Sequence, residues 1–490
     1  MHIVFAASEG VPFAKTGGLA DVVGALPPEI VKIGHRVTVY MPLYTPVRNR
    51  IGEQPYAIRS ITVPFRHYNR YAGVVDGGIH DGVQYYFIEC QDLFDRKELY
   101  GPGGGDYPDN AERFGFFSRA VLEATKQLGV PDVLHVHDWQ TGMIPVYLHT
   151  TYADDPVFEK TATVMTIHNA AYQGAFPPST TEQLLLPWNV FTMDRVEQFD
   201  RFNFLKGGLV FADLLTTVSR KYAEEIQTAE FGWGLEGVLR DRSKDLHGIL
   251  NGVDYSKWNP AKDGNLAAHY SAENLAGKKE CRRDLLHAFG LDGVAETTAV
   301  IGIVSRLATQ KGFDMVAQIS EKLMDRDVVV VAIGTGEPVF ESFFRGWAFR
   351  YPNQVSVRIA YDEVMSHKIE AGADIFLMPS RYEPCGLNQI YSLKYGTVPV
   401  VRATGGLDDT IEEWDAKKET GTGFKFEGYD ARDLLVEVDR ALAAFQDKQA
   451  WEQLMRNGMR QEFGWDGSAR EYVKVYEICA ERVGAGKSAD

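Results

Sequence analysis

Cysteine is scarce in this sequence of 490 residues. There are four cysteines, and no two of them form a CxxC pair. This spacing argues against a zinc knuckle or a thioredoxin-type redox site. A disulfide framework is not expected in so large a chain, so we expect reduced thiols and a cytoplasmic protein. The four residues are Cys90, Cys281, Cys385 and Cys479.

Positive charge and long apolar runs are also in short supply. Lys and Arg total 51 against 67 Asp and Glu, which leaves a formal net charge of −16. A surface this acidic disfavours non-specific binding to nucleic acids and to anionic membranes. No stretch approaches 18 uncharged apolar residues, so no membrane span is predicted. The opening residues MHIVFAASEG indicate a first strand rather than a signal peptide.

Short runs rich in Val, Ile and Leu recur along the chain and alternate with amphipathic stretches. Near-continuous apolar runs are typical of parallel strands covered by helices on both faces. The alternation predicts an α/β fold with doubly wound sheets, and about a dozen strands favour two sheets rather than one. The expected strands are 2–8, 36–43, 83–89, 133–137, 163–168 and 214–219 in the first half, and 248–250, 300–307, 328–334, 355–361, 375–380 and 398–403 in the second. The expected helices include 111–127, 313–324, 363–371, 430–445 and 468–483.

The boundary between the two domains is expected near residues 240–250, before HGILNGVD. This gives one domain over 1–245 and a second over 246–465. The amphipathic segment 468–483 must pack against one of them, and the last residues, GAGKSAD, indicate a loose tail.

The first motif with chemical meaning is KTGGLADVVGALP, from Lys15 to Pro27. It follows the first strand and opens a helical pattern. Gly17 and Gly18 allow tight turning and close approach of a ligand, and a helix N-terminus attracts anions. The motif is neither GxGxxG nor a Walker A sequence, and a simple Gly-rich turn between strand and helix is the alternative interpretation.

The second motif is SRLATQKGFD, in which Arg306 ends a strand and Lys311 precedes a helix. Ligands of open α/β sheets bind beyond the carboxyl ends of the strands. Two cations at this place, in a protein so acidic overall, suggest a clamp for a diphosphate. The alternative is a pair of solvated charges on a loop.

The third motif spans residues 380–410 and contains EPCG and TGGLDDT. Glu383 can orient sugar hydroxyls, and Pro384 predicts the first turn of a helix whose N–H groups can meet a phosphate. Cys385 is expected to be a small buried residue rather than a nucleophile. We expect Asp408 and Asp409 to cap a helix rather than to hold a metal.

Two further strand ends carry polar residues. The strand TVMTIH is followed by His168 and Asn169, and HVHDWQTG places Asp138 and Trp139 at another strand end. A carboxylate beside an aromatic ring is a common sugar-binding pair and also a common packing pair. A single histidine at a strand end is usually structural.

Seven motifs occur in order over residues 15–410, and together they resemble bacterial glycogen synthases and plant starch synthases. They are KTGGLADV, HVHDWQTG, TIHNAAYQG, ILNGVD, SRLATQKG, EPCGLNQIYSLKYGT and TGGLDDT. The resemblance implies the GT-B architecture, with two Rossmann-like domains facing a central cleft. It also implies acceptor binding by the first domain with its KTGGL loop, ADP-glucose binding by the second, and a helix in 466–490 that crosses back to the first.

The resemblance further implies transfer of glucose from ADP-glucose to the non-reducing 4-OH of an α-1,4-glucan, with retention and without cofactor or metal. Arg306 and Lys311 would clamp the leaving diphosphate, and backbone N–H groups around Gly18 and Leu387 would complete the cradle, with Lys15 nearby. Glu383 would hold the donor glucose, and His168 would lie near its C6 hydroxyl.

Further site residues follow from the same resemblance. Tyr361 would stack on adenine, and Asp21 would line the acceptor side. Tyr391 stands where many GT-B enzymes have a second glutamate, which disfavours a two-glutamate mechanism and favours front-face attack. The remaining positions matched to the family site are Asp138, Asn169, Asn251, Cys385 and Gly386.

Three alternatives remain beside this interpretation. A GT-B enzyme could use UDP-glucose and a small acceptor, and an inactive paralogue could bind glucan without turnover. A pyridoxal-phosphate phosphorylase is disfavoured because the chain is short and has no matching lysine motif. The sequence does not specify the oligomeric state. Glucan affinity is assigned to aromatic side chains such as Trp139, Trp188 and Trp233.

Overall fold

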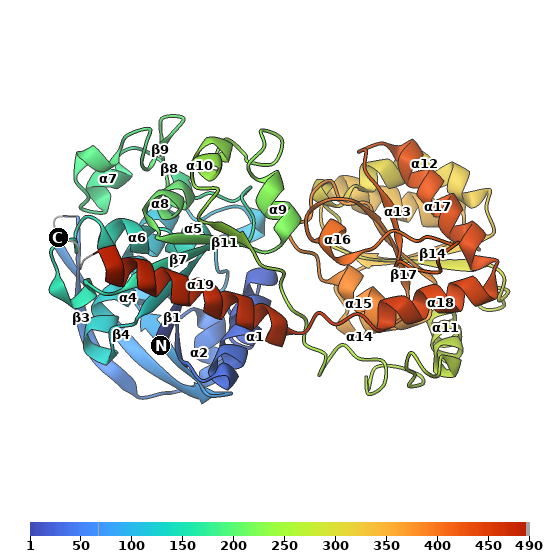
Figure 1. Ribbon diagram of the computed structural model, residues 1–490, viewed down its shortest axis with the longest axis horizontal. Helices are drawn as coiled ribbons and strands as arrows, with labels where there is room; N and C mark the ends of the chain where they lie inside the picture. The colour runs from blue at the N-terminus through green and yellow to red at the C-terminus, as the bar shows by residue number, and fades with distance from the viewer. Residues whose placement is uncertain (67, 487–490) are drawn as a thin grey trace. The chain divides into compact units, whose positions relative to one another are not determined.

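The chain forms two compact units in the computed structural model, which describes residues 1–66 and 68–486 (Figure 1). Unit 1 contains Met1–Val218, Ala223–Gly252 and the C-terminal stretch from Trp465. Unit 2 contains Ser219–Tyr222 and Val253–Gly464. The chain therefore passes between the units near residue 220 as well as at 252/253 and 464/465.

Unit 1 is built on a nine-stranded sheet in the order β12-β11-β7-β6-β1-β2-β5-β4-β3. Strands β12 to β5 in that order run parallel, and β4 and β3 add an antiparallel hairpin at one edge. The central strand β1 is apolar and fully buried from Ile3 to Ala6, as a strand covered on both faces must be. The strands are β1 (His2–Ala6), β2 (Arg36–Pro42), β3 (Tyr56–Phe65), β4 (Tyr68–His80), β5 (Val83–Glu89), β6 (Val133–His137), β7 (Ala162–Ile167), β11 (Leu214–Thr217) and β12 (Leu246–Gly248).

The helices of unit 1 cover this sheet, and the longest of them ends the described chain. The helix α19 (Trp465–Gly486) packs against α1 (Gly18–Ile33), β6 and β7. The unit also contains a separate small sheet, formed by the strands β8 (Ala175–Phe176), β10 (Arg201–Asn203) and β9 (Glu197–Gln198). The other helices are α2 (Thr45–Ile51), α3 (Gln91–Phe94), α4 (Asn110–Leu128), α5 (Asp138–Thr141), α6 (Met143–Leu148), α7 (Thr180–Gln183), α8 (Phe204–Phe211) and α10 (Glu236–Asp241). The helix α9 (Arg220–Glu225) has its first residues in unit 2 and its last residues in unit 1.

Unit 2 is built on a six-stranded, wholly parallel sheet in the order β15-β14-β13-β16-β17-β18. In β14, Val328 and Val330 belong to one hydrophobic cluster and Val329 and Val331 to another, so both faces of the strand are buried. The strands are β13 (Ala299–Val304), β14 (Val328–Gly334), β15 (Val355–Ile359), β16 (Ile375–Met378), β17 (Val398–Arg402) and β18 (Phe424–Phe426). The helices are α11 (Ala276–Ala288), α12 (Phe313–Met324), α13 (Pro338–Arg350), α14 (Glu363–Gly372), α15 (Asn388–Lys394), α16 (Gly405–Thr410), α17 (Ala431–Phe445) and α18 (Lys448–Met459).

The twelve predicted strands are all present, in two sheets, with ends displaced by a few residues. One of them was assigned to the wrong half: the strand expected at 248–250 is β12, which pairs with β11 of the first sheet. The expected boundary at 245/246 therefore lies inside unit 1. The helix expected to open at Pro384 begins only at Asn388, so Pro384 lies in the preceding loop.

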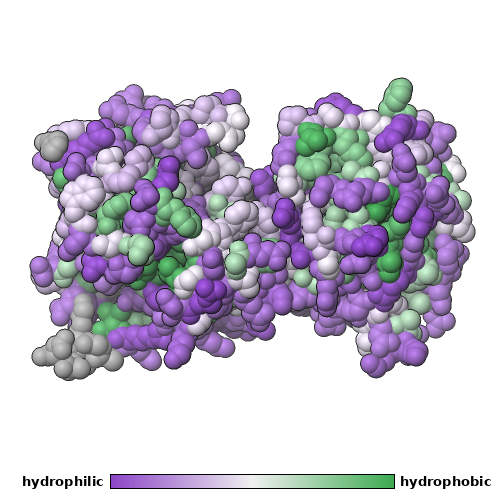
Figure 2. All heavy atoms as spheres, turned by 90° about the horizontal axis from the view of Figure 1, so that it is seen from above, coloured by the Kyte–Doolittle hydropathy of each residue, from purple (hydrophilic) through white to green (hydrophobic). Residues whose placement is uncertain are grey.

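Among the described residues, no helix combines the length and the apolar character needed to cross a membrane. The face drawn in Figure 2 is mostly hydrophilic, with hydrophobic residues gathered in separate patches.

Candidate active site

In unit 1 the predicted site residues follow neighbouring strands. The strands β1, β6 and β7 lie side by side and parallel, so their carboxyl ends meet at one edge of the sheet. The KTGG loop follows β1, Asp138 follows β6, and His168 and Asn169 follow β7. Asn251 follows β12, two strands beyond β7, where it is buried and its Oδ1 has no hydrogen-bond partner among the described residues.

Asp138 is a buried carboxyl group held by backbone. Its Oδ1 accepts the N–H of His168 at 2.7 Å, and the N–H of Asn169 donates to the same carboxyl group. Burial raises the pKa of Asp138 to about 7, against the lowering effect of these two N–H groups. Its backbone has φ +52°, a conformation that most non-glycine residues avoid and that often marks a functional position.

The His168 imidazole is buried and contacts another histidine. Its Nε2 lies 3.0 Å from Nδ1 of His137, and its Nδ1 has no partner among the described residues. Burial lowers the pKa of His168 to about 3. The ring is therefore neutral at physiological pH and offers a hydrogen bond rather than a positive charge.

The KTGG loop is anchored by Glu9, a residue that sequence reasoning missed. The buried Glu9 carboxylate accepts from the hydroxyl of Thr16 at 2.9 Å, from the N–H of Gly17 at 3.2 Å and from the hydroxyl of Tyr100 at 3.0 Å. Lys15 Nζ lies 2.7 Å from Asp21 Oδ1, so these two predicted residues form a partly exposed ion pair. The signal in the sequence was a carboxylate eight residues before Gly17.

The two glycines of this loop do not adopt the conformation expected of a tight turn. Neither Gly17 nor Gly18 has a positive φ, and a Cβ added to either would meet no atom within 4 Å. The expectation that they permit a tight turn is wrong. The open space beside them is compatible with the other expectation, the close approach of a ligand.

In unit 2 the main polar contact joins two predicted residues. Lys311 Nζ lies 2.6 Å from Glu383 Oε2, which also accepts from the hydroxyl of Ser380 at 3.0 Å. Gly312 makes this possible, since its φ is +73° and a Cβ there would lie 2.0 Å from the carbonyl oxygen of Pro379. Arg306 is exposed and forms no ion pair with any described residue.

The two Gly-containing motifs within residues 383–406, EPCG and TGG, are packed backbone against backbone. Gly405 and Gly406 lie against the backbone of the EPCG segment, where a Cβ would come within 1.9 Å of the Glu383 oxygen and 1.8 Å of the Cys385 oxygen. The N–H of Gly406 donates to the carbonyl of Glu383 at 3.0 Å. The second motif therefore fixes the loop that carries Glu383, buried Cys385 and Gly386, and Leu387 then takes the N-cap position of α15.

Comparison with known proteins identifies the family. The starch synthase catalytic domain matches residues 2–241, and glycosyl transferases group 1 matches residues 292–457. A glycogen synthase from Koribacter versatilis is 57% identical over 97% of this chain and 98% of its own length. A glycogen synthase from Thermotoga petrophila is 45% identical over 99% of this chain and 100% of its own. The chain belongs to the glycogen and starch synthase family of glycosyltransferases.

Solved structures agree with this family and establish the fold. The catalytic domain of starch synthase IV from Arabidopsis thaliana, solved with ADP and acarbose, matches with a TM-score of 0.87 and 32% identity, covering 98% of this chain and 99% of that one. A sucrose-phosphate synthase from Thermosynechococcus elongatus matches in fold alone, with a TM-score of 0.59 and 15% identity over 97% of this chain and 98% of that one. The chain is a glycosyltransferase with the α/β GT-B fold.

Other predicted residues lie outside these clusters. Tyr361 follows β15 and is 80% exposed, so its ring is available for stacking. Asp409 does cap a helix, because it accepts the N–H groups of Arg220 and Lys221 at the start of α9. Asp408 instead pairs with Lys425 at 2.7 Å.

The three tryptophans assigned to glucan binding differ in exposure. Trp139 is buried against Phe114 and Phe204, so its assignment as a surface aromatic is wrong. Trp188 and Trp233 are 52% and 47% exposed.

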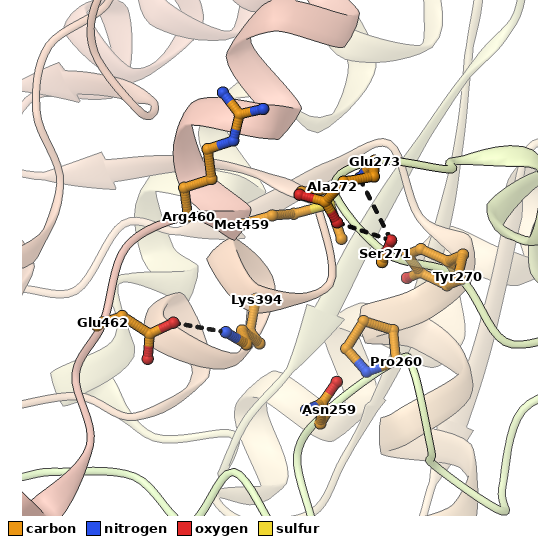
Figure 3. A pocket seen from close by; sticks show the side chains of 10 residues that line it. All are labelled: Asn259, Pro260, Tyr270, Ser271, Ala272, Glu273, Lys394, Met459, Arg460 and Glu462. Atoms are coloured by element: carbon orange, nitrogen blue, oxygen red, sulfur yellow. Dashed lines mark hydrogen bonds and ion pairs between the residues drawn. The ribbon is translucent and has the colours of Figure 1, made fainter.

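A cavity of about 280 Å³ in unit 2 is lined by ten residues, none of which is a predicted site residue (Figure 3). Lys394 and Glu462 form an ion pair of 3.0 Å in its wall, beside Tyr270 and Arg460. Lys394 ends α15, whereas the EPCG loop precedes the start of the same helix. The predicted site residues therefore contribute nothing to the lining of this cavity.

Proposed function

We propose that this chain is a glycogen synthase that transfers glucose from ADP-glucose to the non-reducing 4-OH of an α-1,4-glucan, with retention and release of ADP. The observation that carries the proposal is the buried Glu383 carboxylate, held by Lys311 and Ser380 beyond the carboxyl end of a parallel strand. We also propose a cytoplasmic location, because no disulfide joins the four buried cysteines.

The leaving diphosphate presents the largest electrostatic task, since negative charge develops on it as the glycosidic bond breaks. We assign this task to Arg306, whose guanidinium is exposed and free of ion pairs among the described residues, together with Lys311. The backbone N–H groups near Leu387 and Gly18 stand at helix starts, where the helix dipole favours anions. Tyr361 would stack on the adenine.

The acceptor is assigned to unit 1, and both Glu383 and His168 are assigned contacts with the donor glucose. A neutral His168 can hydrogen-bond a glucose hydroxyl through its unpartnered Nδ1, and Asn251 can do so through its unpartnered Oδ1. Asp138 and Asn169 lie beside His168 at the same sheet edge. Lys15 and Asp21 belong to the loop assigned to the acceptor side.

Front-face attack fits these residues better than double displacement. Double displacement needs a carboxylate nucleophile at the anomeric carbon. Tyr391 stands where many GT-B enzymes have a second glutamate, and Glu383 is paired with Lys311 through Oε2. In the front-face mechanism the acceptor O–H bond breaks and its proton passes to the departing phosphate oxygen, while the acceptor oxygen forms the new bond to the anomeric carbon.

ADP release in the presence of glycogen tests the role of Glu383. Glu383→Gln keeps the size of the side chain but removes the charge that faces Lys311, so kcat should fall about 100-fold or more, as for other preorganised electrostatic groups. The matched control is Glu321→Gln, which changes an exposed carboxylate paired with Arg350 on the same unit and should keep full activity. Equal activity of Glu383→Gln and Glu321→Gln would refute the assignment of Glu383 to the active site.

A further inference from the structure

The two loops that carry the predicted site lysines are each held by a glutamate through a threonine. In unit 1 the Glu9 carboxylate accepts both the N–H and the hydroxyl of Thr16, the residue after Lys15. In unit 2 the Glu337 carboxylate accepts the N–H of Thr309 at 2.8 Å and its hydroxyl at 2.8 Å. We call each arrangement, one carboxylate and the two donor groups of one threonine, a Glu–Thr clasp. The same contact therefore occurs in both units.

The clasp in unit 2 fixes the turn that ends at Lys311. Thr309 is the first residue of the η4 turn (Thr309–Lys311), and its carbonyl accepts the N–H of Gly312 at 3.3 Å. The N–H at the start of such a turn has no partner within the turn, and Glu337 supplies one. Glu337 is itself tied to the same loop, since its own N–H donates to the carbonyl of Leu307 at 2.7 Å. The position of Lys311 therefore depends on Glu337 through Thr309.

The clasp in unit 1 has the same consequence for the KTGG loop. Glu9 is buried and also accepts the N–H of Gly17, so it holds two successive N–H groups of the loop backbone. Lys15 directly precedes these two residues, and Gly18 directly follows them. One side chain from the preceding segment therefore fixes the backbone between the two predicted ligand contacts.

The clasps do not use the charges of the neighbouring lysines. Lys15 pairs with Asp21, and Lys311 pairs with Glu383. A carboxylate has two oxygens that accept and no hydrogen to donate, so it can take the N–H and the O–H of one threonine together. Such charge-assisted hydrogen bonds are stronger than those between neutral groups. The two clasp carboxylates therefore act on the backbone of their loops rather than as counter-ions of the lysines.

We propose that Glu9 and Glu337 are positioning residues for ligand binding: through the Glu–Thr clasps they hold the loops of Lys15 and Lys311 in the conformation that binds the ligand. A loop that adopts this conformation only part of the time binds with an apparent affinity reduced by that fraction. Loss of a clasp therefore weakens binding, whereas a saturating ligand restores the conformation and with it kcat. The proposal rests on the proposed function for the identity of the ligands, ADP-glucose and glucan.

Substitutions of the two threonines test the clasps without changing the core, because Thr16 and Thr309 are exposed. Thr16→Val and Thr309→Val keep the shape of the side chain and the backbone N–H but remove the hydroxyl, whereas Thr16→Ser and Thr309→Ser keep both donors. Glu337→Gln leaves one accepting oxygen for the two donors of Thr309. The matched controls are Thr151→Val in unit 1 and Thr297→Val in unit 2, at exposed threonines outside both loops.

Hydrogen–deuterium exchange reports the clasps directly, because an amide exchanges when the structure around it opens. We expect faster exchange over residues 15–18 in Thr16→Val. Exchange over residues 309–312 should be faster in Thr309→Val and Glu337→Gln. The serine variants and the two controls should exchange as wild type does. This measurement needs no substrate.

Kinetics with ADP-glucose and glycogen then test the role in binding. We expect Thr309→Val and Glu337→Gln to raise KM for ADP-glucose about fivefold, the effect of about 1 kcal/mol for one lost hydrogen bond, with kcat and melting temperature unchanged. Thr16→Val should raise KM for ADP-glucose or for glycogen by a similar factor. The serine variants should keep the KM values of wild type.

Two results would overturn the proposal. One is unchanged exchange in both valine variants and in Glu337→Gln, which would show that the clasps do not hold the loops. The other is faster exchange with unchanged KM values for both substrates, which would limit the clasps to loop structure. A wild-type protein with the expected exchange but no transfer from ADP-glucose would refute the proposed function instead. The dissociation constant of ADP, measured by calorimetry in Thr309→Val and wild type, would then decide on the clasp in unit 2.

Discussion

Burial determines the charge of single residues at the edge of the unit 1 sheet. Asp138 is buried without a cation, so the pKa of its carboxyl rises to about 7, and His168 is buried without a carboxylate, so the pKa of its imidazole falls to about 3. In unit 2, Glu383 is buried against Lys311 and forms an ion pair. The two groups of residues differ in kind near pH 7: His168 offers a neutral hydrogen-bonding group, whereas Lys311 and Glu383 offer charges.

The raised pKa of Asp138 predicts a pH-dependent cost to stability. In the unfolded chain this carboxyl ionises near pH 3.8, but in the folded protein it ionises near pH 7. The folded state holds the proton more tightly, so the destabilisation is absent below about pH 4, grows as the pH rises and is complete above about pH 7. Asp138→Asn keeps the oxygen that accepts from His168 and tolerates φ +52°. Its melting temperature should exceed that of wild type at pH 8 and equal it near pH 4, and a difference independent of pH would contradict the buried charge.

Substitution of Gly18 should weaken ligand binding without lowering the stability of the fold. A Cβ at this position meets no protein atom and φ is not positive, so Gly18→Ala should fold with unchanged or slightly higher stability. If a ligand approaches the backbone of the KTGG loop, the added methyl group should raise KM at least about tenfold, the effect of about 1.4 kcal/mol of lost binding. Steady-state kinetics and thermal unfolding measure the two effects separately. Unchanged KM values for both ADP-glucose and glycogen would exclude a ligand at Gly18.

At the scale of secondary-structure elements, the loops between strands and helices place the chemistry. The η4 turn (Thr309–Lys311) is pressed against the end of β16 because Gly312 takes a left-handed conformation at the N-cap of α12. The segment at 405–406 supports the EPCG loop in the same way. In both cases a glycine permits two backbones to approach where no other residue fits.

Gly312→Ala should therefore disturb both the fold and the site. The new Cβ would lie 2.0 Å from the Pro379 oxygen in a strained conformation, so we expect about 1–3 kcal/mol of lost stability and a loss of kcat as Lys311 leaves Glu383. Gly346→Ala is the matched control, because Gly346 is exposed inside α13 with no atom within 4 Å of its added Cβ. This substitution should stabilise by about 0.5–1 kcal/mol. Denaturant titration would measure both, and a Gly312→Ala variant as stable as wild type would contradict the close approach.

Some of these secondary-structure elements can be predicted from the sequence, and others cannot. Strands such as β14 were predicted because both of their faces are buried, which leaves a continuous apolar run. The edge strand β3 was missed because it mixes exposed and buried residues, and the start of α15 was misplaced because Pro384 indicated a first turn that the loop does not form. Candidate site residues were predicted where a motif marks them, whereas Glu9 is recognised only through contacts such as that with Tyr100, 91 residues away in the sequence.

At the scale of the whole molecule, the C-terminal helix belongs to the same unit as the N-terminal part of the chain. The helix α19 packs on α1, β6 and β7, and its side chains Tyr472, Tyr476 and Cys479 are buried. Unit 1 thus needs residues from both ends of the sequence, while unit 2 is formed mainly by the stretch between them.

Removing a buried ring of α19 should destabilise unit 1. Tyr476 is fully buried, so Tyr476→Ala should cost about 3–5 kcal/mol, as large-to-small changes of buried aromatic residues do. Lys474→Ala on the same helix changes an exposed residue and should alter stability by less than about 0.5 kcal/mol. Chemical denaturation followed by tryptophan fluorescence compares the two variants, and equal stabilities would show that α19 does not support unit 1.

Transfer of labelled glucose to glycogen, from ADP-[¹⁴C]glucose and in parallel from UDP-[¹⁴C]glucose, tests most directly what the protein does. β-Amylase, which removes maltose from the non-reducing ends of α-1,4-glucans, then reports the linkage formed. We expect label to enter glycogen from ADP-glucose far faster than from UDP-glucose and to be released as maltose. Transfer preferentially from UDP-glucose, or label that β-amylase cannot release as maltose, would contradict an ADP-glucose-dependent α-1,4-glucan synthase.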